Sequence, residues 1–129
     1  MHADEEMLNQ ITGRIIGCAY RVGNELGYGF LEKVYENAFA HELTKAGLRV
    51  DQQFPIAVYY DGVEVGKYFA DLLVEGVVLV ELKSVRTFDD IHTAQCINYL
   101  VATHLPICLL INFGKRVDVR RYANTPGRS

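Results

Sequence analysis

The chain has 129 residues, half of them hydrophobic, and a formal net charge of −3. This length predicts one domain, spanning residues 1–129, which can bury a core without disulfides or metals. The composition and the absence of low-complexity tracts argue against disorder. The acidic balance lacks the basic excess that is typical of nucleic-acid-binding proteins.

The ends of the chain and its cysteines suggest a compartment. The amino terminus is acidic where a signal peptide would be basic, and no apolar run approaches the roughly 20 residues that span a membrane. The four histidines lack zinc-binding spacing. We expect a cytoplasmic protein without a membrane partner, and buried thiols in a reducing compartment at three widely spaced positions: Cys18, Cys96 and Cys108.

Helical periodicity marks the first part of the chain. Apolar residues recur every three or four positions over Asp4–Leu26, which predicts a helix with one apolar stripe. That stripe could cover the sheet or a second copy of the chain in a homodimer, and both remain open. A second helix is predicted over Phe30–Ala46, ended by Gly47. Its expected apolar face consists of Leu31, Val34, Tyr35, Ala38, Phe39 and Leu43.

Strand patterns follow. Arg49–Tyr60 and Val63–Val74 are rich in β-branched and aromatic residues, and the Asp61–Gly62 turn signal between them predicts a hairpin. Glu75–Gly76 is a second turn signal, before a strand over Val77–Lys83. The remaining predicted elements are a helix over Ile91–Thr103, strands over Ile107–Asn112 and Val117–Tyr122, and a polar tail over Asn124–Ser129. The order ααβββαββ predicts an α/β fold with a mixed sheet flanked by helices.

Charged residues interrupt two apolar strands of this pattern. Glu81 and Lys83 lie two positions apart at the end of an otherwise apolar strand, so their side chains share a face. A salt-bridged pair where the strand meets solvent would explain them. Asp71 weakens that explanation, because it places a further carboxylate inside the preceding apolar strand.

The turn between these strands decides whether the two carboxylates meet. A two-residue turn pairs Asp71 with Val80 and sends the Asp71 and Glu81 side chains to opposite faces. A three-residue turn with Gly76 at positive φ, or a bulge, puts them on one face. A metal site therefore requires the odd-length turn.

Two carboxylates on one face, with the Leu82 main-chain carbonyl between them, would suit Mg²⁺ or Mn²⁺. Such an ion could polarise a phosphodiester and activate water. Lys83 could then orient the water or stabilise charge on the phosphate. The residue types are sufficient for phosphodiester hydrolysis.

The segment Gly29–Tyr35 has the pattern GxxExxY, and from Ile11 to Tyr122 the chain resembles the bacterial GxxExxY proteins of the PD-(D/E)XK nuclease superfamily. The resemblance implies a restriction-endonuclease-like core with a mixed sheet. Besides Glu81-Leu82-Lys83, it rests on further blocks in a fixed order: Asp71–Val74, Gln95 with Tyr99, and Leu110–Gly114.

The resemblance also implies roles for individual residues. Asp71, Glu81 and Lys83 match the superfamily motif, although Ala70 replaces the usual proline. Glu32 resembles the helix-borne glutamate that completes the metal site in several branches. The remaining pair, which resembles the QxxxY motif of the RecB-like exonucleases, is Gln95 and Tyr99.

Several of these residues have structural explanations too. Glu32 suits the first turn of a helix because of the helix dipole. Tyr35 suits core packing with a bonded hydroxyl. Gln95 and Tyr99 could simply bond to each other at a helix–sheet contact.

The leading functional hypothesis is a Mg²⁺-dependent nuclease acting on DNA. The alternative is a non-catalytic module that keeps the fold and binds nucleic acid or protein, since fold does not determine function. A third hypothesis is hydrolysis of another phosphate ester. The cations of Lys115–Arg121 do not separate these hypotheses, because a solvated strand edge and a phosphate-binding rim both explain them.

Overall fold

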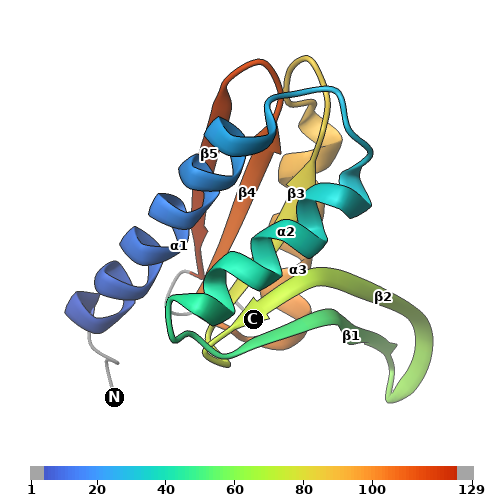
Figure 1. The fold of residues 1–129 in the computed structure, drawn as a ribbon. Helices are drawn as coiled ribbons and strands as arrows, with labels where there is room; N and C mark the ends of the chain where they lie inside the picture. Colours follow the sequence, from blue (N-terminus) through green and yellow to red (C-terminus); the bar gives the residue numbers. More distant parts are fainter. Residues whose placement is uncertain (1–4, 125–129) are drawn as a thin grey trace.

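The computed structural model describes residues 5–124, which form a five-stranded mixed sheet with two helices on one face and one on the other (Figure 1). This is the predicted α/β architecture and element order. Residues 125–129 of the expected polar tail, and Asp4 at the expected start of the first helix, lie outside the described residues. The elements are α1 (Glu5–Leu26), α2 (Glu32–Lys45), β1 (Val50–Tyr60), β2 (Val63–Val74), β3 (Val78–Lys83), α3 (Asp90–Thr103), β4 (Ile107–Phe113) and β5 (Val117–Ala123).

The strands lie in the sheet in chain order, β1-β2-β3-β4-β5. β3 and β4 are parallel, with α3 as the crossover between them, and the other neighbours are antiparallel. The predicted β1–β2 turn is present: Tyr60 pairs with Val63, and Asp61 and Gly62 both have positive φ. Because β3 and β4 are parallel, their carboxyl ends lie side by side, with Lys83 opposite Asn112.

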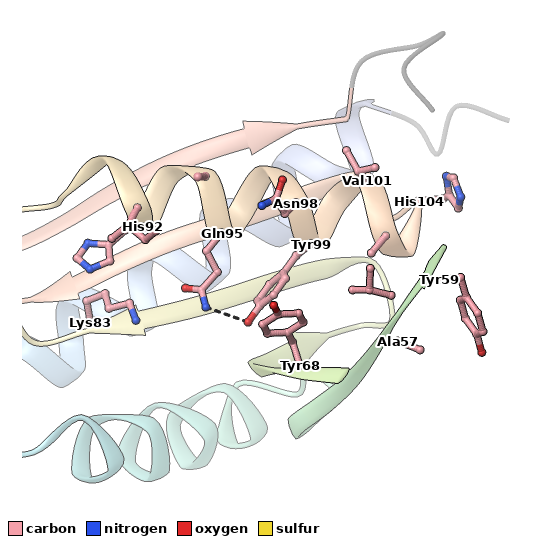
Figure 2. A pocket seen from close by; sticks show the side chains of 14 residues that line it. Ala57, Tyr59, Tyr68, Lys83, His92, Gln95, Asn98, Tyr99, Val101 and His104 are labelled. Carbon is pink, nitrogen blue, oxygen red and sulfur yellow. Dashed lines mark hydrogen bonds between the residues drawn. The ribbon is translucent and has the colours of Figure 1, made fainter. Parts of the chain in front are cut away.

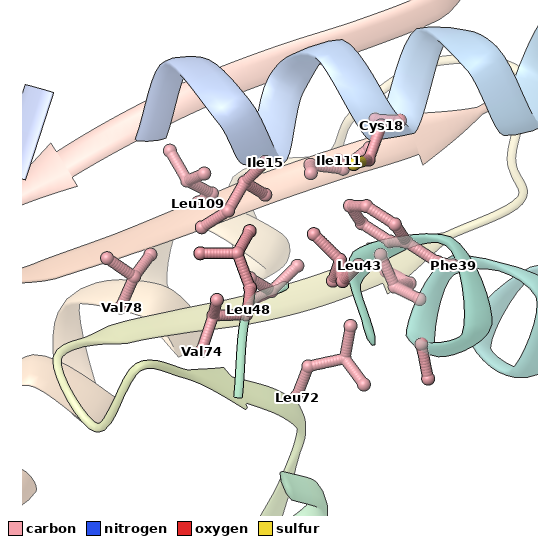
Figure 3. Close-up of a cluster of buried hydrophobic side chains, with 14 of the residues drawn as sticks. Ile15, Cys18, Phe39, Leu43, Leu48, Leu72, Val74, Val78, Leu109 and Ile111 are labelled. Atoms are coloured by element: carbon pink, nitrogen blue, oxygen red, sulfur yellow. The ribbon is translucent and has the colours of Figure 1, made fainter. Parts of the chain in front are cut away.

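The face under α1 and α2 is a continuous apolar core (Figure 3). Ile15 and Cys18 of α1 meet Leu109 and Ile111 of β4, so the apolar stripe of α1 covers the sheet. All three cysteines are buried, as expected. Within residues 5–124, no helix is long and apolar enough to cross a membrane.

The predicted apolar face of α2 is partly wrong. The helix begins at Glu32 rather than Phe30, so Leu31 is its N-cap and is 79% exposed. Val34 is exposed as well, whereas Glu36 is buried at 4% exposure. Glu36 therefore faces inward, where hydrogen bonds from Gln52 and Gln53 satisfy its carboxylate.

The other face of the sheet carries only α3. Its apolar cluster is smaller and includes Ile56 from β1, Ala70 from β2 and Leu79 from β3, packed against Leu100 of α3. Because one helix cannot cover five strands, part of this face forms a cavity whose lining includes Lys83 at the carboxyl end of β3.

Candidate active site at a bend in the β1–β2 hairpin

The turn between β2 and β3 has the odd length that the same-face arrangement requires. Val74 pairs with Val78 and Leu72 with Val80, which leaves three residues in the turn. Gly76 in this turn has a φ of +68°. The register therefore carries Asp71 opposite Glu81 rather than Val80, and this structural prediction is confirmed.

The β1–β2 hairpin turns over at Asp71. The pairs Gln52–Leu72 and Phe54–Ala70 flank a position that the ladder skips, and Gln53 there has a φ of +55°. Ala70 packs in the α3-side cluster but Leu72 packs in the α1/α2-side cluster, although residues two apart on a regular strand share a face. Asp71 thus lies at an irregularity in the pairing of β1 with β2.

Asp71 and Glu81 are held together by reciprocal hydrogen bonds. The Asp71 amide donates to Glu81 Oε1 at 3.0 Å, and the Leu82 amide donates to Asp71 Oδ2 at 2.7 Å. Each carboxylate thus replaces a ladder partner of the other strand. The second oxygen of Asp71 accepts only a long bond from Gln53, at 3.4 Å, and no bond to Glu81 Oε2 occurs within residues 5–124. One oxygen of each carboxylate remains available for a ligand.

Burial and mutual repulsion disfavour the charged forms of both acids. Burial raises the pKa of Glu81 to about 8, with the neighbouring Asp71 carboxylate as the next cause. Burial likewise raises the pKa of Asp71, and Glu36 and Glu32 contribute in the same direction. Among the residues described, neither acid forms an ion pair with Lys, Arg or His. The salt-bridge explanation of Glu81 and Lys83 is therefore not what the fold adopts.

Lys83, Gln95 and Tyr99 line one cavity on the α3 side of the sheet (Figure 2). The charge of Glu81 acts on Tyr99, and that of Lys83 acts on Glu81, so this group neighbours the acidic pair. Gln95 Nε2 donates to the Tyr99 hydroxyl at 3.1 Å. Burial raises the pKa of Tyr99 above its ordinary value, and the charge of Glu81 adds to this, so the phenol stays protonated at neutral pH. Lys83 lowers the pKa of Glu81, but by less than burial and Asp71 raise it.

The two α2 glutamates differ from the sequence expectation. Glu32 is exposed, and it affects the acidic pair through its charge, raising both pKa values. Glu36, which the sequence analysis did not select, is buried and accepts bonds from Gln52 at 2.8 Å and Gln53 at 3.0 Å. The Gln53 amide thus spans Glu36 and Asp71. The i,i+4 spacing from Glu32 was the one available sequence signal for Glu36.

Tyr35 serves the core, as its structural explanation proposed. Its hydroxyl donates to the Gly27 carbonyl at 2.6 Å, and its ring stacks on Phe113 at 4.8 Å between centroids. The same hydroxyl accepts a bond from the Phe30 amide. Tyr35 therefore shapes the loop that precedes Glu32 and is not placed to react.

Asn112 fixes the segment that follows Lys83, a role that the sequence analysis missed. Its side-chain amide donates to the Val85 carbonyl at 2.7 Å and accepts from the Val85 amide at 2.9 Å. A Cβ at Gly114 would lie 3.0 Å from the same carbonyl, so only glycine fits there without a shift. These contacts account for part of the Leu110–Gly114 block.

The donor set fits a divalent cation incompletely. The buried Glu81 and the partly buried Asp71, which have no ion-pair partner among residues 5–124, favour Mg²⁺ or Mn²⁺, which prefer oxygen ligands and retain waters. The part of the chain that is described has no cluster of three or more acidic, histidine or cysteine side chains around one point, so Glu32 does not join Asp71 and Glu81 in this arrangement. Water, the Leu82 carbonyl or a moved Glu32 would complete the coordination.

Comparison with known proteins identifies the superfamily and supports the fold. Residues 9–122 match the PD-(D/E)XK nuclease superfamily, and the chain therefore belongs to that superfamily. Its fold is similar to that of an alkaline exonuclease from Laribacter hongkongensis, with a TM-score of 0.50 and 17% sequence identity. The likeness covers 72% of this chain and 56% of the exonuclease chain, so the chain spans little more than half of that protein. A comparison with curated proteins found no significant match.

Proposed function

We propose that this protein hydrolyses phosphodiester bonds of DNA with Mg²⁺ or Mn²⁺, at a site made of Asp71, Glu81 and Lys83. The observation that carries the proposal is the acidic pair itself. The buried Glu81 and the partly buried Asp71 lie next to each other without an ion-pair partner among residues 5–124, and the raised pKa values report the unfavourable energy of charging them. A divalent cation would offset that energy, so metal binding explains why the two carboxylates lie together, whereas packing does not.

In this proposal each residue of the site has a separate role. Asp71 and Glu81, with the Leu82 carbonyl, hold the cation, and Glu32 supplies a further carboxylate from α2. When bound, the cation polarises the phosphodiester and activates water. Lys83 stabilises the negative charge that develops on the phosphate. Gln95 and Tyr99 position the substrate at the same end of β3.

The test is cleavage of labelled single- and double-stranded DNA, with and without Mg²⁺ or Mn²⁺. Asp71→Ala and Lys83→Ala are each expected to reduce cleavage by roughly 100-fold or more, because each removes electrostatic stabilisation in a water-poor site. Asp51→Ala is the matched control, since Asp51 is an exposed carboxylate on the neighbouring strand. Circular dichroism checks folding, and calorimetric titration with Mn²⁺ separately measures metal binding, which only Asp71→Ala should weaken.

Cleavage that persists in both variants would come from a contaminant and would contradict the proposal. DNA binding without cleavage would instead favour the alternative, a non-catalytic module of the same fold. The narrower assignment to the GxxExxY proteins belongs to the proposal too, and it is supported by Tyr35 of α2, whose hydroxyl bonds to Gly27 and Phe30 at the α1–α2 loop. The three buried free thiols support a reducing, cytoplasmic setting.

A further inference from the structure

A cavity of about 870 Å³ lies between α3 and the part of the β1–β2 hairpin beyond the bend, and Lys83 of β3 lines it (Figure 2). Lys83 stands at one end of the cavity, and Tyr59 and His104 stand at the other. The volume is in the usual range for sites that bind small organic ligands. A substrate with its phosphate at Lys83 therefore has this cavity next to it.

Most of the cavity lining is apolar or aromatic, and no carboxylate lines it among residues 5–124. Tyr68 is 52% exposed and Tyr59 is 65% exposed, so both rings have free surface. The ring of Tyr68 lies 6.1 Å from that of Tyr99, tilted by 52°, and no other aromatic ring within residues 5–124 pairs with it. Lys83 and His92 bring nitrogen groups to one end of the cavity (Figure 2). The cavity thus has a cationic end and an aromatic middle.

We propose that this cavity binds unpaired nucleotides of the substrate strand, with a base stacked on Tyr68 and the phosphate toward Lys83. The inference rests on the proposed function, because it takes the cleaved phosphate to lie at Lys83. The cationic end matches the phosphate and the aromatic surface matches the flat base, the combination by which proteins bind single strands.

Pairing decides which form of the substrate enters. A base within a duplex is already paired and stacked, and bringing it into the cavity means extruding it at a cost of a few kcal/mol, by the general energetics of base flipping. An unpaired base avoids that cost and gains stacking on Tyr68. The substrate class is therefore a single strand, or the single-stranded end of a duplex.

The test measures binding of fluorescent oligonucleotides to the full chain at low salt in EDTA, where metal-dependent cleavage is absent. Tyr68→Ala is expected to weaken binding of a single strand roughly 5- to 100-fold, the range for loss of one stacked base. The same substitution should not change binding of a fully abasic strand of equal length. Tyr68→Trp should keep the affinity. Tyr60→Ala, which removes a 74%-exposed tyrosine of the same hairpin outside the cavity, is the matched control.

Two further arms separate the possible occupants. A blunt duplex should bind more weakly than the single strand and should not respond to Tyr68→Ala. RNA of the same sequence shows whether the sugar matters, and dependence on Tyr68 with either strand supports the inference. Equal affinities of wild type and Tyr68→Ala for every oligonucleotide would overturn it. If Tyr68→Ala kept the wild-type affinity but differed from wild type in molar mass by light scattering, a second copy of the chain would fill the cavity. That result would overturn the inference too.

This assay also separates the inference from the proposed activity. Binding that depends on Tyr68, in a protein that never cleaves, would support the cavity and reject the nuclease. Metal-dependent cleavage that depends on Asp71, with binding indifferent to Tyr68, would support the nuclease and reject the cavity.

Discussion

The two faces of the sheet differ in the kinds of side chain that they bury. Under α1 and α2, the buried side chains from three strands and both helices form one apolar cluster. Under α3 the cluster is smaller, and beside it lie Glu81, Lys83 and an open cavity. An apolar residue is stabilised by burial alone, whereas a buried carboxylate needs partners. The first face therefore supplies the stability that lets the second hold groups that are unfavourable there.

The largest effect is expected from a substitution in the closed face, which is the face under α1 and α2. Phe39→Ala deletes a fully buried ring that packs against Phe113, and it should lower the free energy of unfolding by about 3–5 kcal/mol. Tyr68→Ala removes a half-exposed ring from the open face, and it should cost about 1 kcal/mol or less. Urea denaturation measures both. Equal losses would mean that the open face is as closely packed as the other.

The next test uses the pH dependence of stability without metal. The folded-state pKa of Glu81 is raised to about 8 from 4.5, so between these pH values the folded chain retains a proton that the unfolded chain has lost. The contribution of Glu81 to the free energy of unfolding should therefore be most favourable below about pH 4.5, fall as the pH rises, and level off above about pH 8. The total change from this residue should be on the order of a few kcal/mol.

Glu81→Gln removes this titration and should flatten the decline, as measured by urea denaturation in EDTA at a series of pH values. The control, Glu64→Gln, changes an exposed glutamate on β2 and should leave the decline intact. A decline of the same size in Glu81→Gln would show that other groups cause it.

The smallest expected effect concerns the bend. Gln53→Ala removes the amide that spans Glu36 and Asp71 but keeps a side chain in the left-handed region, whereas Gln53→Gly removes the amide and relieves the backbone. The glycine variant should be more stable than the alanine variant by about 1 kcal/mol. Both should weaken Mn²⁺ binding alike in calorimetry, because both release Asp71. Wild-type metal affinity in both variants would show that Gln53 does not position Asp71.

Much of the fold was predictable because its signals are local. Helical periodicity identified α1, and Asp61–Gly62 identified the β1–β2 turn, since positive φ at both positions suits those residues. The sequence showed that an odd-length turn is needed to align Asp71 with Glu81, but it did not predict which turn length forms. Two- and three-residue turns both use glycine, and the choice depends on how the whole strand pairs.

The sequence by itself determined the element types, their order, and the acidic residues that interrupt apolar strands, because periodicity and turn chemistry act over a few residues. Only the tertiary structure decided that Glu36 rather than Leu31 turns inward, that the hairpin turns over at Gln53 and Asp71, and that Tyr68 borders a cavity. Each of these depends on packing between segments far apart in the chain. Long-range packing sets the rotation of a helix and the twist of a hairpin, and local propensity does not encode either.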